Sequence, residues 1–424
     1  MKKIKEGIYL ANEYSKKYKT NMILVRFIMP FDVHAATANH LLSRMFEDGS
    51  LNIHSKSELE QKLANLYGAD LSVSVKRSGN FLEFTLLTRL VRTSLLNENK
   101  EMMTDWFNLI KELLFNQKFD ETNHLIVERF NHEKKLLEQA LKRRFDNKNK
   151  LVIYKLYQTL YQEDDEKVIG GYGSLEVLKS LQLKDIQQAY NRIIDEAQVM
   201  VIGHGEFKGE MIESFVNEWP LKSRDVKYNF IHNQIKLEAT SYPLQMEKME
   251  AEQSKLAVAY KLPNISSQKE RVTFMVANAV FGGMATSRLF MNIREKESLC
   301  YTIHSNLILQ RQMLLVQAGI DPGQAEYVYK RIDEELIGIQ EELENDDYFK
   351  EIKLSLKSNL VEAQDAQSNE IGLILSEFLR PDLDLSLDNY LRLIDETTTQ
   401  DVQEAMKQCQ RITGFYLEGG EANE

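Results

Sequence analysis

The residues of greatest chemical interest lie on one expected helix near the N-terminus. His40, Ser43 and Arg44 stand at the three key positions of the pattern His-x-x-Glu-His. On a helix this spacing brings two imidazoles to one face, where both can bind zinc while the glutamate activates a metal-bound water. Only the first histidine is present here. Ser43 cannot take a proton from water near neutral pH, and Arg44 stays protonated.

The charge of Arg44 weighs against a metal at this place. A fixed cation about 4 Å from a divalent ion costs on the order of 8 kcal/mol at an effective dielectric constant near 20. One imidazole does not recover that energy, so we interpret His40 as an ordinary helical histidine and expect this chain to bind no metal. His132-Glu133 resembles the start of His-Glu-x-x-His, but Leu136 stands at the second histidine position. The remaining histidines show no ligand spacing: His34, His54, His124, His204, His232 and His304.

A second segment combines an arginine and a tyrosine. Arg294 and Tyr301 follow the run Ser287-Arg288-Leu289-Phe290 with the spacing Arg-x6-Tyr. A fixed guanidinium and a phenol hydroxyl aimed at a substrate carbonyl would stabilise the negative charge that develops on it. The plainer alternative is that Arg294 pairs with carboxylates at a helix end and that Tyr301 begins a strand.

Hydrophobic periodicity predicts the elements that carry these residues. Helices and strands mix without strict β-α-β alternation, which is typical of the α+β class. In the first half we expect a strand over 21–29, helices over 35–45 and 57–67, a hairpin of 71–76 with 81–87, and a charged helix over 120–142. In the second half we expect a strand over 255–260, helices over 270–281 and 287–296, and strands over 301–309 and 312–318.

A distant internal repeat indicates two related domains. The segment that begins at Asp185 has a polar helix start, a helix, and an apolar run from Val199 that ends in glycine and acid. The segment that begins at Asp401 repeats this order, with its apolar run from Gly414. Each of these two repeated segments stands at the end of one half of the chain. We therefore predict an N-terminal domain over 1–220, a linker over 221–244 and a C-terminal domain over 245–424, each a mostly antiparallel sheet packed with helices.

Composition excludes several classes of partner. The net charge of −11 argues against nucleic acid and anionic membranes. The only cysteines, Cys300 and Cys409, make no disulfide framework and no multi-cysteine zinc site. The N-terminal residues show neither a signal peptide nor a membrane-spanning run. We expect a cytoplasmic protein without membrane insertion.

The two motifs, their order and their separation resemble those of the pitrilysin/insulinase family of inverted-motif zinc peptidases. The resemblance is specifically to the two-domain branch that includes the mitochondrial processing peptidase, and it covers essentially the whole chain. Its specific motifs lie within 38–50, 130–140 and 281–301. The resemblance implies a LuxS/metallopeptidase-like fold that forms half of a clamshell. The degraded zinc helix is similar to that of bacterial YmfF-like proteins, which are paired with zinc-bearing YmfH-like partners.

The resemblance also assigns roles to individual positions. The family's third zinc ligand is the second glutamate of Glu-x6-Glu; Glu133 matches the first glutamate, but Ala140 stands at the ligand position. The resemblance implies that Arg294 and Tyr301 hold the substrate and contribute to catalysis in trans. The family's usual Arg-Gly-Leu-Ala before the tyrosine reads Glu-Ser-Leu-Cys here, over 297–300. Substrate is expected to add as an extra strand at a sheet edge near 71–76.

These observations lead to one principal hypothesis and two alternatives. The principal one is a catalytically deficient zinc-metallopeptidase homologue that holds peptide substrate for a zinc-bearing paralogous partner, with zinc bound only by the partner. The isolated chain could also form a homodimer. The first alternative is a purely structural or assembly subunit, and the second is an independent metallopeptidase with unusual ligands.

Overall fold

The chain folds into two compact units, and each unit combines segments from both halves of the sequence. The computed structural model describes residues 1–96, 101–117, 119–207, 210–226, 228–231, 233–238, 241–341, 343 and 346–420. Unit 1 contains Met1–Arg143, Ile169–Asn233 and Gln367–Phe378. Unit 2 contains Arg144–Val168, Gln234–Ala366 and Leu379–Glu424.

Unit 1 is built on a six-stranded sheet with the strand order β1-β2-β6-β3-β5-β4. Neighbouring strands are antiparallel except for β2 and β6, which are parallel. The predicted hairpin is formed by β4 and β5, and it turns at Gly79, whose φ of 57° suits glycine. The strands are β1 (Lys2–Lys5), β2 (Ile8–Tyr14), β3 (Thr20–Pro30), β4 (Asp70–Ser78), β5 (Phe81–Val91) and β6 (Gln198–Gly205).

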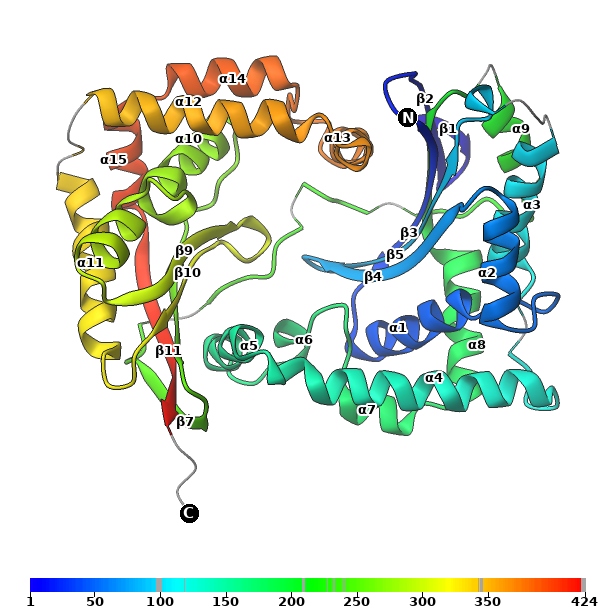
Figure 1. The fold of residues 1–424 in the computed structure, drawn as a ribbon, viewed down its shortest axis with the longest axis horizontal. Helices are drawn as coiled ribbons and strands as arrows, with labels where there is room; N and C mark the ends of the chain where they lie inside the picture. The colour runs from blue at the N-terminus through cyan, green and yellow to red at the C-terminus, as the bar shows by residue number, and fades with distance from the viewer. Residues whose placement is uncertain are drawn as a thin grey trace. The chain divides into compact units, whose positions relative to one another are not determined.

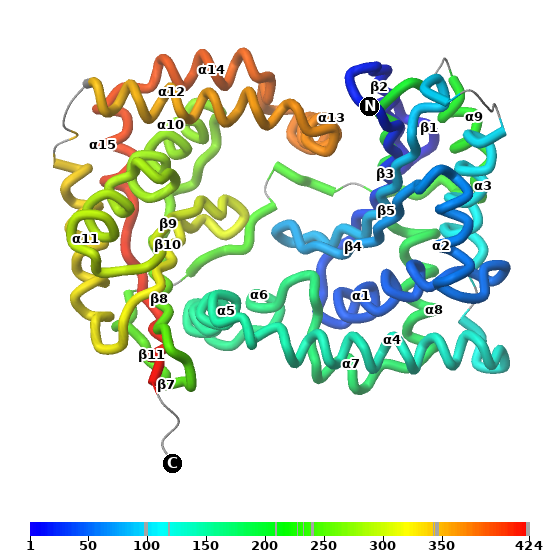
Figure 2. The backbone as a smooth tube through the Cα atoms, viewed as in Figure 1, coloured from blue at the N-terminus to red at the C-terminus, as the bar shows by residue number. Residues whose placement is uncertain are grey.

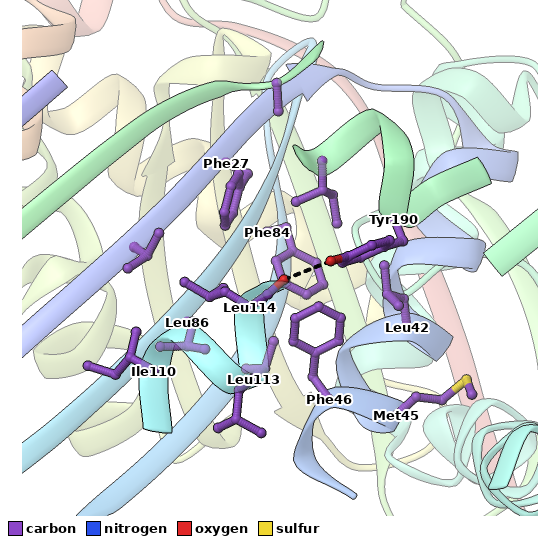
Figure 3. Close-up of a cluster of buried hydrophobic side chains, with 14 of the residues drawn as sticks. Phe27, Leu42, Met45, Phe46, Phe84, Leu86, Ile110, Leu113, Leu114 and Tyr190 are labelled. Carbon is purple, nitrogen blue, oxygen red and sulfur yellow. Dashed lines mark hydrogen bonds between the residues drawn. The ribbon is translucent and has the colours of Figure 1, made fainter. Parts of the chain in front are cut away.

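Most helices of unit 1 contribute to one hydrophobic core with this sheet, and α4 and α7 pack against α1 (Figure 1). Phe46 of α1 meets Phe84 of β5 edge to face, with ring centroids 5.4 Å apart. Tyr190 of α8 closes the same cluster and donates its hydroxyl hydrogen to the carbonyl of Leu114 at 3.1 Å (Figure 3). The helices are α1 (Val33–Glu47), α2 (Lys56–Asn65), α3 (Glu101–Phe115), α4 (His124–Arg143), α7 (Leu175–Ser180), α8 (Leu183–Asn191), α9 (Met211–Asn217) and α13 (Gln367–Leu379).

Helix α13 joins unit 1 through a polar contact with strand β6. His204, which is fully buried, lies 2.6 Å from a carboxylate oxygen of Glu370. The other oxygen of Glu370 accepts from the Tyr18 hydroxyl at 2.7 Å and from Lys17 at 3.1 Å. Burial opposes the ionisation of Glu370, but the hydrogen bonds from these three side chains outweigh it, so the pKa of Glu370 is lowered. His204 is thus a structural histidine.

Unit 2 contains a five-stranded sheet with the order β7-β11-β8-β10-β9. The C-terminal strand β11, red in Figure 2, lies between β7 and β8 and runs parallel only to β7. The strands are β7 (Gln245–Glu250), β8 (Ser254–Lys261), β9 (Cys300–Ile308), β10 (Met313–Ile320) and β11 (Gln410–Gly420). The helices are α5 (Lys148–Leu160), α6 (Asp165–Val168), α10 (Gln268–Asn278), α11 (Ala325–Glu341), α12 (Asp346–Ala363), α14 (Leu387–Glu396) and α15 (Thr399–Lys407).

Short irregular helices complete the two units. Two π-helices stand in unit 2 beside the predicted Arg/Tyr segment: η4 (Ala279–Gly283), which continues α10, and η5 (Leu289–Lys296). Such turns are rare and occur often at functional sites. The remaining ones are η1 (Thr93–Leu95), η2 (Arg144–Asp146), η3 (Arg192–Glu196) and η6 (Leu309–Arg311).

The predicted α+β class with two helix-packed sheets is confirmed. The structure differs from a division into continuous halves, because α5 packs on β8 and β11 of unit 2 and α13 packs in unit 1. Val152, Leu156 and Leu160 of α5 are buried in a core with strand residues of unit 2. Among the described residues, no helix is both long enough and apolar enough to cross a membrane.

Candidate functional site

The degraded metal motif lies on helix α1, as the spacing predicts. Asp32 caps the helix by accepting from the Ala35 amide at 2.6 Å. His40 is partly buried, and its Nδ1 lies 3.1 Å from the carbonyl oxygen of Tyr172. Ser43 is buried, and its hydroxyl donates to the His40 carbonyl at 2.8 Å. The hydroxyl hydrogen of the serine that replaces the general base is therefore bonded within its own helix.

Arg44 occupies the second ligand position, and it is tied to helix α4. Its Nε lies 2.7 Å from a carboxylate oxygen of Glu133, whose side chain is 9% exposed. The orientation is that of an ion pair, without the alignment of a hydrogen bond. The Arg44 guanidinium already neutralises the motif glutamate, Glu133, so that carboxylate is not free for a metal, and it adds a positive charge beside His40. These residues do not fit zinc.

The third ligand position offers no donor. Ala140 is exposed on α4, two helical turns after Glu133, and its methyl group cannot bind a metal. Over the part of the chain that the structure describes, no three His, Cys, Asp or Glu side chains are grouped to hold a metal ion. His232, one of the histidines without ligand spacing, lies outside the described residues.

A third residue on the same face of α1 was missed by the sequence analysis. Glu47 follows His40 by seven residues and Arg44 by three, so the three side chains share one helix face. One carboxylate oxygen of Glu47 accepts a hydrogen bond from the Val73 amide of β4 at 2.8 Å. The i, i+4, i+7 spacing of His40, Arg44 and Glu47 in the sequence could have shown that Glu47 lies on this face. This face of α1 thus contacts the backbone carbonyl of Tyr172, helix α4 and strand β4.

The Arg/Tyr pair of unit 2 lies on two consecutive elements, η5 and β9. The Arg294 guanidinium stacks on the Phe290 ring at 4.4 Å from its centroid and lies 3.6 Å from Glu295. Tyr301 is 57% exposed and donates its hydroxyl hydrogen to Asp321 at 2.8 Å. This hydrogen bond raises the pKa of Tyr301, because the carboxylate disfavours a phenolate beside it. Asp321 was not anticipated, since only the register of β9 and β10 brings it next to Tyr301.

The turn between Arg294 and Tyr301 keeps a conformation that suits glycine. Ser298, where the family usually has glycine, adopts a φ of 53°. The amide of Leu299 then donates back to the Ile293 carbonyl at 2.9 Å and closes the helix end. The left-handed turn is therefore present without glycine, at the conformational cost of a non-glycine residue in this region.

Part of the same motif has a structural role. Glu335 of α11 is buried, and one of its oxygens accepts from Arg288 at 2.9 Å and from Asn292 at 2.8 Å. The other oxygen accepts from Arg331 at 2.8 Å, and Arg331 also binds the exposed Glu297. Arg288 thus anchors η5 to α11, and its presence is explained by the fold alone.

Comparisons with known proteins agree with this arrangement. Residues 180–356 match the family described as the peptidase M16 inactive domain. The chain is 21% identical over 411 residues to the "probable inactive metalloprotease YmfF" of Bacillus subtilis, covering 96% of this chain and 95% of the relative. The chain therefore resembles the M16 metallopeptidases. The resemblance to a zinc-deficient member of the pitrilysin family is therefore confirmed.

Solved structures show the same likeness over nearly the whole chain. A conserved protein from Enterococcus faecalis V583 superimposes with a TM-score of 0.90 at 25% identity, covering 99% of this chain and 98% of that protein. A peptidase M16 inactive domain structure from Pseudomonas fluorescens gives a TM-score of 0.74 at 15% identity, with coverages of 98% and 96%. The second likeness shows a shared fold.

Proposed function

We propose that this M16 homologue is the substrate-holding subunit of a heterodimeric zinc peptidase whose zinc is bound by a paralogous subunit. The observation that carries the proposal is a contrast between two faces. The helix face that would bind zinc is taken up by internal contacts of His40, Arg44 and Glu47. Arg294 and Tyr301 keep the motif spacing, and their side chains are substantially exposed.

The chemistry of the exposed pair suits a peptide backbone. The contact of Arg294 with Glu295 is exposed, and such pairs hold a guanidinium weakly. Its N–H groups can therefore turn to peptide carbonyl oxygens. Tyr301 has given its hydrogen to Asp321, so its oxygen is set to accept from a peptide N–H. Donor and acceptor together match the alternating groups of an extended chain.

The remaining parts of the proposal concern partners and place. Zinc and the general base would come from a YmfH-like partner, and the substrate would be a peptide. We propose the cytoplasm as the compartment, with no nucleic acid among the partners. The isolated chain could pair with a second copy where the partner is absent.

The two alternatives differ in their support. A purely structural subunit is favoured by the Arg288–Glu335 contact, which shows that part of the motif serves the fold. An independent metallopeptidase finds no three-ligand group in the described part of the chain. Zinc analysis of the purified protein after dialysis tests that alternative, since a stoichiometric ion would support it.

The decisive experiment uses the pair of subunits. The chain is purified with its native zinc-bearing partner, and peptide cleavage is compared for the wild type, Arg294→Met and Tyr301→Phe. We expect each substitution to lower kcat/KM by about a hundredfold, because an interaction made beside the reacting carbonyl is lost. Lys296→Met, a matched loss of charge on the same helix η5, should stay within twofold. Unchanged cleavage by all variants would establish the structural role instead.

A further inference from the structure

Strand β4 is the last strand of the unit 1 sheet, so within the described part of the chain one of its edges has no neighbouring strand. Backbone groups along an antiparallel strand point alternately towards the partner strand and away from it. The Val73 amide bonds to Glu47 and not to β5, so it points to the open edge. By the same alternation, Leu71, Val75 and Arg77 also direct their backbone groups outwards. An exposed edge of this kind is a template for an added strand.

The open edge is covered by the chain itself at two places. Glu47, the last residue of α1, satisfies the Val73 amide at 2.8 Å. At Arg77, four residues after Val73, the strand is approached by Gly171. A Cβ added to Gly171 would lie 2.8 Å from the backbone nitrogen of Arg77. Arg77 in turn donates to the Ile169 carbonyl at 2.7 Å, which fixes that segment on the strand. The stretch between Val73 and Arg77 is therefore bounded at both ends.

We propose that Glu47 is a built-in occupant of the β4 edge, which an extended peptide must displace in order to add there. This rests on the proposed substrate-holding function and names a regulatory contact at the peptide-binding edge. The carboxylate takes the place that a peptide carbonyl oxygen would take on the Val73 amide. Because the acceptor is a side chain at a helix end, it can move away without unfolding α1. Peptide binding is thereby weakened by competition within the chain.

The first measurement tests the cap itself. Hydrogen exchange of the segment 70–76 is followed by mass spectrometry for the wild type, Glu47→Ala and Glu47→Gln. We expect Glu47→Ala to speed the exchange in this segment about tenfold, and Glu47→Gln to have a smaller effect because its amide oxygen can still accept. Glu58→Ala is the matched control, since Glu58 accepts from the His54 amide at 2.9 Å on another helix. Equal exchange in all four proteins would overturn the proposal.

The second measurement tests the competition. Binding of fluorescein-labelled oxidised insulin B chain, an unstructured peptide, is measured by fluorescence anisotropy with the purified full chain. Glu47→Ala should bind about tenfold more tightly than the wild type, Glu47→Gln about threefold, and Glu58→Ala equally. Equal or weaker binding by both Glu47 variants, or binding by none of the proteins, refutes the edge proposal. Such results would not bear on the proposed function itself. The experiment with Arg294→Met and Tyr301→Phe measures cleavage by the two subunits together, and Glu47 is unchanged in it.

Discussion

Replacing Glu335 with glutamine should destabilise unit 2 selectively. The side chain of Glu335 is 6% exposed, and it receives hydrogen bonds from Arg288, Asn292 and Arg331. Glutamine has only one acceptor oxygen. It can therefore keep either the two hydrogen bonds from Arg288 and Asn292 or the single one from Arg331, but not all three. Its amide hydrogens then face a guanidinium, and the buried negative charge is lost.

The size of the effect follows from these contacts. Losing one hydrogen bond to a charged group costs about 1.5–3 kcal/mol, and an uncompensated buried charge costs about 3–5 kcal/mol. Arg331 keeps its contacts with Glu297 and Glu334, and Arg288 is 24% exposed, so water recovers part of the loss. We expect the free energy of unfolding of unit 2 to fall by about 2–3 kcal/mol.

The two tryptophans make the assay specific for each unit. Trp106 and Trp219 both lie in unit 1, so their fluorescence reports on that unit, whereas far-ultraviolet circular dichroism reports on both. In urea, Glu335→Gln should lower the denaturant concentration at which unit 2 unfolds, as seen by circular dichroism. The midpoint of the fluorescence transition, which reports on unit 1, should stay nearly unchanged. Glu334→Gln is the matched control, because Glu334 also bonds Arg331 but is 41% exposed, and this substitution should have a much smaller effect than Glu335→Gln. Equal effects of the two substitutions would refute the structural interpretation of Arg288.

Three further outcomes can be measured on the same purified chain. Ser298→Gly should raise the stability of unit 2 by about 0.5–1 kcal/mol, seen by circular dichroism, because glycine adopts the positive φ without strain; a loss of stability would contradict the turn geometry. Arg44→Met should lower the stability of unit 1 by about 2 kcal/mol, and adding Glu133→Met should restore most of it; additive losses in this double-mutant cycle would count against the ion pair. The lowered pKa of Glu370 means that its stabilising effect is present above the unfolded value of about 4.5 and is lost as the pH falls through the lower folded value. Acid unfolding followed by tryptophan fluorescence should therefore show a shallower dependence on pH below about 4.5 for Glu370→Gln, and identical slopes would show that the docking of α13 does not depend on this charge.

The amino-acid sequence determined the elements and their class. The β4–β5 hairpin follows from its alternation around a glycine turn, and α1 follows from its apolar spacing behind a capping aspartate. The loss of a metal-binding residue set was also legible, because Ser43, Arg44 and Ala140 lack ligand chemistry whatever their surroundings. Such properties depend on residue type and on separations of a few residues, which local geometry fixes.

Only the tertiary structure decided which partners these residues meet. The ion pair of Arg44 with Glu133 joins two helices, and the bond of Glu47 to Val73 joins a helix to a strand. The exchange of α5 and α13 between the units likewise depends on which apolar face each helix finds buried space for. These contacts span many residues, and the sequence carries no periodic signal for them. Their energies arise from burial and from the pairing of charges, and both come into being only when the distant segments pack together.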